Sequence, residues 1–233
     1  MSFENQNIAE ISNIGSGVFI TGTDTGVGKS IFTAVIALLK LAEGKEVAIA
    51  KPIQTGLSKD TDFLRELTGN KIPIFNTYDF SLASAPSVAS SFENKKIETA
   101  KIISDIKNLE KQFDFVIVEG IGGIAVPIGP TYLVLDLIKD LNYPTIIVAR
   151  PLLGTINHSV LTIEFARRKK INILGFVISG YDDMANDIII KTAPEEICKV
   201  TGCKCLVKIP IFKKLNHGLL NEYIASLQML SKI

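Results

Sequence analysis

Short apolar runs alternate with segments of helical periodicity along most of the chain. Apolar runs predict strands at residues 18–21, 46–50, 115–118, 145–149 and 174–178, with a weaker one at 206–208. Between them, three- and four-residue spacing predicts helices at 30–42, 60–68, 97–111, 133–141, 156–168, 186–200 and 218–232. Strands that are apolar throughout are covered on both faces. The pattern therefore predicts an α/β fold with a doubly wound, mainly parallel sheet and helices on both faces.

One domain is expected, at residues 18–233, after a polar extension at residues 1–17. A chain of 233 residues can fold around a single α/β core, and no repeat, low-complexity tract or linker divides it. The extension is expected to be partly disordered, with docking as an extra segment as the alternative. The least regular stretch, residues 70–94, is expected to form loops above the sheet.

The net charge and the N-terminal sequence argue against nucleic acid and membranes as partners. The 25 lysines and arginines nearly balance 24 acidic residues, for a net charge of +1. No broad field therefore favours nucleic acid or an anionic membrane. The start lacks the pattern of a signal peptide, and no apolar run approaches the length that spans a bilayer. We expect a cytoplasmic protein that binds neither nucleic acid nor membrane.

A glycine-rich segment joins the first predicted strand to the first long helix, Thr23-Asp-Thr-Gly-Val-Gly-Lys-Ser30. Gly26 and Gly28 let backbone N–H groups approach a phosphate at the positive end of a helix. Lys29 adds a cation, and Ser30 stands where a hydroxyl commonly ligates the Mg²⁺ of a nucleoside triphosphate. The strict phosphate-loop pattern wants glycine at Thr23, so an ordinary glycine-rich turn is the alternative. The position between strand and helix favours the phosphate loop.

Further polar residues follow the second and third predicted strands. Lys51 is placed to reach the same phosphates, and Thr55 to donate to a substrate oxygen, although a lone lysine is usually only solvated. Asp60 and Asp62 open a helix, where aspartates mostly act as caps. Glu119 follows its strand directly, at the place where phosphate-loop enzymes hold or orient Mg²⁺. The sequence thus predicts a nucleotide site at one edge of the sheet.

The three cysteines, Cys198, Cys203 and Cys205, lie close together in the sequence. A metal site would need a fourth ligand nearby, and the histidines are His158 and His217. We expect reduced thiols and assign no function to the cluster.

Four motifs, in this order and spacing, resemble the dethiobiotin synthetase family over about residues 18–210. They are Gly22-Thr-Asp-Thr-x-Val-Gly-Lys-Ser30, Lys51-Pro-x-x-Thr-Gly56, Glu119-Gly-x-Gly-Gly123 and Leu153-Gly-Thr-Ile-Asn-His-x-x-Leu-Thr162. The resemblance implies ATP- and Mg²⁺-dependent ring closure of 7,8-diaminopelargonic acid with CO₂. A carbamate of the substrate attacks the γ-phosphate, and the second amine then closes the ring, giving dethiobiotin, ADP and phosphate.

The resemblance also implies roles for single residues. Lys29 and Lys51 stabilise the transferred phosphoryl group, while Thr25 acts beside them and holds the carbamate end with Thr55. Mg²⁺ is expected on Ser30, Asp62 and Glu119, with Asp62 preferred to Asp60 because the Phe-Leu-x-x-Leu after it matches the family's helix better. The expected nucleotide contacts are Gly26, Val27, Gly28, Lys29, Ser30, Ile31, Asp62, Glu119, Gly120, Ile121, Gly122, Ser179 and Pro210.

A homodimer is implied by the fourth motif. Its N–H groups at Gly154, Thr155, Ile156 and Asn157 open a helix and suit a carboxylate. In the family this helix start belongs to the neighbouring subunit and binds the tail carboxylate of the substrate. Plain helix capping by Thr155 or Asn157 is the alternative.

Two positions depart from the family's pattern. Many relatives have glutamate at Gly26, and relatives tend to have asparagine at Ser179, where it reads adenine. A serine hydroxyl lacks the paired donor and acceptor of an amide. GTP or CTP is therefore expected to support turnover better than in relatives with asparagine. Residues 208–210 are expected to line the base pocket.

A second class shares the fold and the loop: partitioning and site-selecting ATPases, which act as dimerising switches on DNA or membrane. They usually carry an extra lysine early in the loop, where this chain has Thr23-Asp-Thr25. Their membrane-binding tails are basic, whereas residues 221–233 contain one lysine, Lys232. Hydrolysis that ignores the diamine but responds to DNA or lipid would favour this class.

Overall fold

A seven-stranded parallel sheet forms the centre of the protein, in the strand order β4-β2-β6-β1-β7-β8-β9. The computed structural model describes residues 8–230 apart from 183, 185–186 and 213. The strands are β1 (Gly17–Gly22), β2 (Val47–Ala50), β4 (Ile74–Phe75), β6 (Phe115–Gly123), β7 (Thr145–Ala149), β8 (Ile173–Tyr181) and β9 (Cys205–Pro210). The predicted α/β architecture is confirmed.

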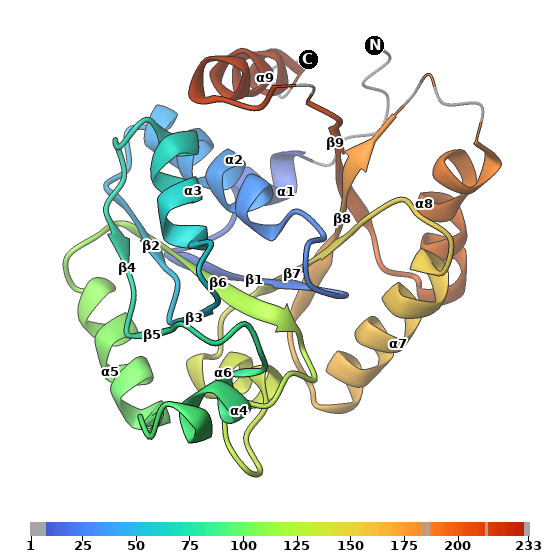
Figure 1. Cartoon of the computed structure of the whole chain (residues 1–233). Helices are drawn as coiled ribbons and strands as arrows, with labels where there is room; N and C mark the ends of the chain where they lie inside the picture. Colours follow the sequence, from blue (N-terminus) through green and yellow to red (C-terminus); the bar gives the residue numbers. More distant parts are fainter. Residues whose placement is uncertain (1–7, 183, 185–186, 213, 231–233) are drawn as a thin grey trace.

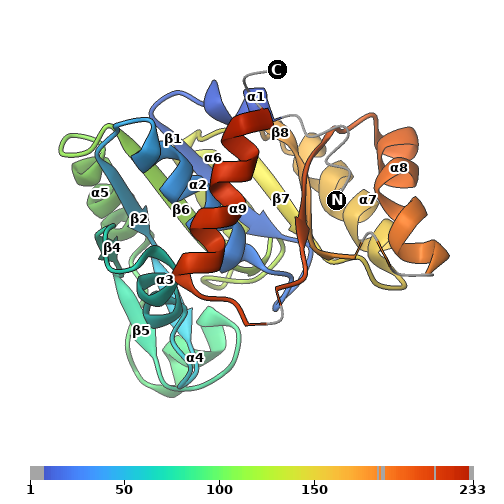
Figure 2. The same ribbon diagram turned by 90° about the horizontal axis from the view of Figure 1, so that it is seen from above.

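Helices cover both faces of this sheet (Figure 1). One layer comprises α1 (Ile8–Ser12), α2 (Lys29–Ala42), α3 (Asp60–Thr68) and α9 (His217–Leu230). The other comprises α4 (Pro86–Phe92), α5 (Thr99–Leu109), α6 (Val134–Leu141), α7 (Thr155–Arg168) and α8 (Ile188–Thr201). Figure 2 shows α9 lying across α2. In β1, Val18 and Ile20 face the first layer and Phe19 faces the second. Because both faces are buried, the strands read as continuous apolar runs.

The N-terminal helix α1 (Ile8–Ser12) is docked through Ile11, and residues 1–7 lie outside the described part. Ile11 and Ile14 are buried in the core beneath the first helical layer. The buried Lys40 donates from Nζ to the Ser12 carbonyl at 2.7 Å and to Glu43 at 2.9 Å. These contacts join α1 to α2 at the end of the sheet where β1 begins.

The stretch expected to be loops contains regular structure, so that prediction is wrong. Besides β4, it includes β5 (Tyr78–Phe80), which pairs in parallel with β3 (Ile53–Thr55) as a separate two-stranded sheet. Strands of three residues are too short to show a period. Pro86 begins α4, where its missing N–H removes no hydrogen bond. Two strands also run further than expected, because β6 continues to Gly123 and β8 to Tyr181.

The connections place a crevice at the carboxyl ends of the central strands. From β1 the chain passes to β2 and β6 on one side, and after β6 it crosses to β7 on the other. Ligands of open α/β sheets bind where the strand order reverses in this way. Among the described residues, no helix is both long enough and apolar enough to cross a bilayer.

Candidate active site

The loop after β1 closes over the start of α2. Gly28 caps this helix with φ 95°, in the left-handed region that favours glycine. A Cβ added there would lie 2.2 Å from the hydroxyl oxygen of Ser179, so a side chain is excluded by contact as well. Lys29 Nζ turns back and donates to the Asp24 carbonyl at 3.0 Å. The loop thus fixes the side chain of Lys29 at the N-terminus of α2.

Lys51 occupies the centre of the site. It is fully buried, with Nζ 2.6 Å from Asp60 Oδ2 and 2.7 Å from Glu119 Oε1, and it donates to the Gly120 carbonyl at 3.0 Å. Burial lowers the pKa of Lys51, but the carboxylates of Glu119 and Asp60 outweigh it and raise that pKa above its ordinary value. Lys51 is therefore a fixed cation at neutral pH.

Lys29 supplies a second, more labile cation. Burial, and then the positive charge of Lys51, lower the pKa of Lys29 to about 8. The carboxylates of Glu119, Asp60 and Asp24 raise this pKa, but by less. An anion bound between the two ammonium groups would favour the charged form of Lys29. The electrostatics of the site therefore suit phosphate.

The oxygen atoms beside Lys51 fit a hard divalent cation. Glu119 Oε1 accepts from Ser30 Oγ at 2.9 Å, whereas the buried Oε2 has no hydrogen-bond partner among the described residues. Asp60 lines the same cleft. Mg²⁺ takes oxygen ligands and shares them with phosphates and water. No group of three or more His, Cys, Asp or Glu in the described chain is placed to hold a metal, so a cation here would also need the Ser30 hydroxyl and nucleotide oxygens.

These groups line a central cleft of about 700 Å³. The predicted residues that line it are Thr25, Gly26, Gly28, Lys29, Ser30, Ile31, Lys51, Thr55, Glu119, Ile121 and Gly122. Val27 is buried within the loop, and Gly120 contributes its carbonyl to Lys51. The sequence missed the wall formed by Ser58, Phe63 and residues 83–86. Nothing in the pattern of that wall marks a site, because its residues are small or apolar.

The preference for Asp62 over Asp60 is corrected by the structure. Asp62 is 71% exposed and pairs with Arg65 Nη1 at 2.6 Å, on the outer side of α3. Asp60 instead contacts Lys51 and lines the cleft. Residues two apart on a helix point about 200° apart, so only one of the two can face inward. Asp60 replaces Asp62 in the set of candidate metal ligands.

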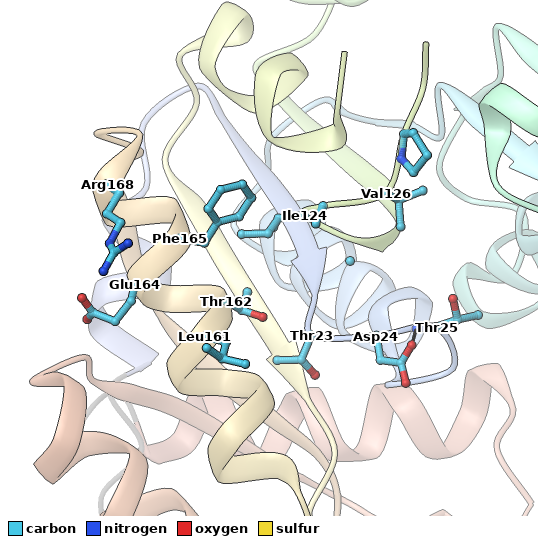
Figure 3. Close-up of a pocket in the computed structure, with 13 residues that line it drawn as sticks. Thr23, Asp24, Thr25, Ile124, Val126, Leu161, Thr162, Glu164, Phe165 and Arg168 are labelled. Atoms are coloured by element: carbon cyan, nitrogen blue, oxygen red, sulfur yellow. Dashed lines mark hydrogen bonds between the residues drawn. The ribbon is translucent and has the colours of Figure 1, made fainter. Parts of the chain in front are cut away.

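A second cavity, the α7 groove, also of about 700 Å³, adjoins the central cleft (Figure 3). In Figure 3 the Phe165 ring on α7 lies beside Ile124, which follows β6, and Leu161 on α7 lies on the side of Thr23. Thr25 and Val126 line both cavities, so the two lie side by side. A polar end at the phosphate loop thus lies next to an apolar groove.

Comparison with known proteins decides the family. A model of the AAA domain family matches residues 16–218. An ATP-dependent dethiobiotin synthetase BioD of Thermodesulfovibrio yellowstonii is 35% identical over 224 residues, covering 89% of this chain and 93% of the relative. A relative of the same name from Methanocaldococcus jannaschii is 38% identical, covering 78% of this chain and 88% of the relative. Another from Bacillus subtilis strain 168 is 37% identical, covering 83% of this chain and 87% of the relative. The chain belongs to the dethiobiotin synthetase family.

Solved structures confirm the phosphate-loop fold of this dethiobiotin synthetase family member. The MinC:MinD complex of Aquifex aeolicus matches with TM-score 0.63, covering 94% of this chain and 96% of that one. A ParA family ATPase of Chlorobium tepidum TLS matches with TM-score 0.58, covering 91% and 99%. Both are 14% identical, so the likeness concerns the fold alone.

The residues expected at the base pocket lie outside the central cleft. Ser179, on β8, is buried with its hydroxyl against Gly28 and does not line the central cleft. Lys208 lies over the Tyr181 ring at 4.9 Å and lines a separate cavity of about 470 Å³ with the cysteines. Pro210 ends β9 opposite Tyr181.

The dethiobiotin synthetase motif at the start of α7 stands apart from the cleft of its own chain. Gly154 caps the helix with φ 91°, Ile156 is half-buried and Asn157 is exposed. Thr155 is buried, and its hydroxyl has no partner among the described residues. None of the four lines the central cleft. The single chain therefore does not bring them to the other predicted residues.

Proposed function

We propose that this chain closes the ureido ring of 7,8-diaminopelargonic acid with CO₂, ATP and Mg²⁺, yielding dethiobiotin, ADP and phosphate in biotin biosynthesis. It would act in the cytoplasm as a homodimeric ligase that binds neither nucleic acid nor membrane. The observation that carries the proposal is the meeting of Lys29, Lys51 and Glu119 in one cleft with Thr25 and Thr55. The named relatives support the same activity.

The proposed reaction needs fixed cations where negative charge develops. A substrate amine adds to CO₂ with loss of a proton, and the carbamate oxygen attacks the γ-phosphorus as ADP leaves. The second amine then attacks the carbonyl of this anhydride, and phosphate leaves as the ring closes. Lys51, held by Glu119 and Asp60, faces the charge on the transferred group without having to reorganise.

The other cleft residues bind and orient the reactants. Lys29 would contact the phosphates, while the Thr25 and Thr55 hydroxyls would hold the carbamate end. The residues that would hold Mg²⁺ are Ser30, Asp60 and Glu119, and the bound cation would neutralise phosphate charge. The unpartnered Oε2 of Glu119 supports this assignment.

The substrate's carbon chain and its tail carboxylate would bind outside the central cleft. The apolar α7 groove suits the chain, because it opens from Thr25 at the reacting end. The tail carboxylate would reach the N–H groups that begin α7 in the partner subunit. Gly154 and the neighbouring Leu152 and Leu153 are exposed in the single chain, which supports a contact there. The dimer would complete the site.

The test is phosphate release from ATP with Mg²⁺ and bicarbonate, with and without 7,8-diaminopelargonic acid. Wild type should require the diamine, and Lys51→Ala should lose at least about a hundredfold in rate. The exposed Lys139 of α6 offers a matched control, because Lys139→Ala should keep full activity. Denaturant unfolding of Lys51→Ala would show whether the variant still folds.

Two results would reject the proposal. Release that is indifferent to the diamine would leave the phosphate loop correct and the substrate wrong. Stimulation by DNA or lipid in place of the diamine would favour the partitioning or site-selecting class of ATPase.

A further inference from the structure

A short loop connects two of the cleft's functional residues. Thr55, Ser58 and Asp60 line the central cleft, whereas Gly56, Leu57 and Lys59 in the loop that joins them do not. Lys59 is the last loop residue and the N-cap of α3, whose first residue is Asp60. Its backbone carbonyl accepts from the Asp62 N–H at 3.2 Å. The backbone of Lys59 thus fixes the point where the helix, and with it the Asp60 carboxylate, begins.

The side chain of Lys59 turns back across the same loop. Lys59 Nζ donates to the Gly56 carbonyl at 2.7 Å and to the Phe80 carbonyl at 3.3 Å, and it forms an ion pair with Asp79. The Gly56 N–H also donates to the Phe80 carbonyl at 3.0 Å. One ammonium group therefore closes the loop on itself and ties it to β5.

Asp79 carries the connection to the other side of Asp60. Its Oδ2 accepts from Gln54 Nε2 at 3.2 Å, and Gln54 Oε1 accepts from the Thr61 N–H at 3.4 Å. Gln54 precedes Thr55 on β3, and Thr61 follows Asp60 on α3. The network formed by Lys59, Asp79 and Gln54 therefore surrounds both cleft residues through bonds to their chain neighbours. Neither Lys59 nor Asp79 lines the cleft.

We propose that Lys59 and Asp79 are positioning residues, which hold Thr55 and Asp60 in the geometry that binds metal nucleotide and carbamate. The inference rests on the proposed function for the roles of Thr55 and Asp60. Asp60 lies in the first turn of α3, and its side chain is 47% exposed. Without support it would leave Lys51 for water. Binding groups keep a productive geometry, to within about 0.5 Å, only where neighbouring packing and hydrogen bonds support them.

Lys59→Met removes the ammonium group and keeps most of the side chain's length. In the full-length protein we expect the KM for Mg·ATP and the KM for the diamine to rise about tenfold. The kcat at saturation should change less than about threefold, because Lys51, Lys29 and Glu119 keep their places. The thermal unfolding midpoint should stay near that of wild type. This split between KM and kcat is a result that a merely structural ion pair would not give.

A double-mutant cycle tests whether Lys59 and Asp79 act together. Asp79→Asn should raise the same KM values, and the Lys59→Met/Asp79→Asn double variant should be no worse than the poorer single variant. Lys59→Arg, which keeps the charge and the donors, should recover most of the affinity. Lys101→Met is the matched control, because Lys101 pairs with Asp105 on the surface of α5. It should leave all constants unchanged.

Binding of Mg·ADP, measured by calorimetry, separates this inference from the proposed function. A tenfold loss of Mg·ADP affinity in Lys59→Met would support the positioning role even if wild type showed no diamine-dependent turnover. Unchanged affinity and KM in Lys59→Met would overturn the inference. A lower thermal unfolding midpoint, with a lower kcat and an unaltered KM, would also overturn it, because the ion pair would then be purely structural.

Discussion

At the scale of single residues, Ser179 and Gly28 lie against each other where α2 begins. The Ser179 side chain packs against the Gly28 backbone, is 6% exposed and lies outside the central cleft. The contact therefore supports the expectation of weak base selectivity for a structural reason beyond the choice of side chain.

A nucleotide panel tests this expectation. In wild type, kcat/KM for GTP and CTP should lie within about tenfold of that for ATP, the worth of about one hydrogen bond. A strict ATP requirement in wild type would contradict the prediction.

Gly28→Ala should abolish binding of Mg·ATP. The substitution combines a φ of 95°, which costs about 1–3 kcal/mol for a residue with a side chain, with overlap against Ser179. Gly44 separates the two effects, because its φ is 81° and a Cβ there meets nothing within 4 Å. Gly44→Ala should lose stability in denaturant unfolding and keep full nucleotide affinity in calorimetry. Normal affinity in Gly28→Ala would contradict the structure of the loop.

Cys203 should react slowly with alkylating reagents at neutral pH. Burial raises the pKa of Cys203 to about 11, and the reactive species is the thiolate. A raised pKa leaves almost all of the group as thiol at pH 7.5, so the alkylation rate should climb steadily as pH rises toward 10. Mass spectrometry after timed alkylation measures this rate, with the unfolded chain as the fast control. Rapid labelling of the folded protein at pH 7.5 would show that the thiol is accessible.

At the scale of elements, a strand could be predicted from the sequence where it was long enough and buried on both faces. Strands β1, β6 and β7 were found because residues buried on both faces leave apolar runs. Strands β3 and β5 were missed because three residues show no period.

In the site, too, only the residues marked by a local sequence pattern could be predicted. Lys29 and Lys51 come after β1 and β2, and Glu119 lies in β6 where the apolar run of that strand ends, so their meeting in one cleft was predictable. The choice between Asp60 and Asp62 was not, because composition does not reveal which side of a helix faces inward. The bond network of Lys59 and Asp79 depends on long-range pairing, which leaves no local pattern.

The short helix α1 depends on its contacts. Five residues cannot form a stable helix alone, and Ile11 is 1% exposed in the core. Ile11→Ala should lower the free energy of unfolding by about 2–4 kcal/mol. Steady-state constants should not change, because α1 lies where β1 begins and the cleft lies where β1 ends. Urea unfolding measures the loss, and Asn13→Ala, at an exposed neighbour, is the control. A loss of activity at full stability would contradict this separation.

At the scale of the whole molecule, the open α7 groove and the exposed Leu153 support the proposed dimer. Leu153→Asp should shift the mass in light scattering from dimer to monomer and raise the KM for the diamine. Affinity for Mg·ADP should persist, because the central cleft belongs to one chain. Met229→Asp, on α9 in the opposite helical layer, is the exposed control. A wild type that is monomeric and fully active would contradict the prediction.

The parallel sheet also governs the order in which the molecule can be built. Gly17 of β1 pairs with Val116 of β6, about 100 positions later, and the other neighbour of β1 is β7. During synthesis, the strand that bears the phosphate loop therefore waits for both partners to leave the ribosome. Long-range pairing of this kind is slow and leaves apolar strand edges open to aggregation. The phosphate loop after β1 therefore becomes able to bind nucleotide only once β7 (Thr145–Ala149) has been made.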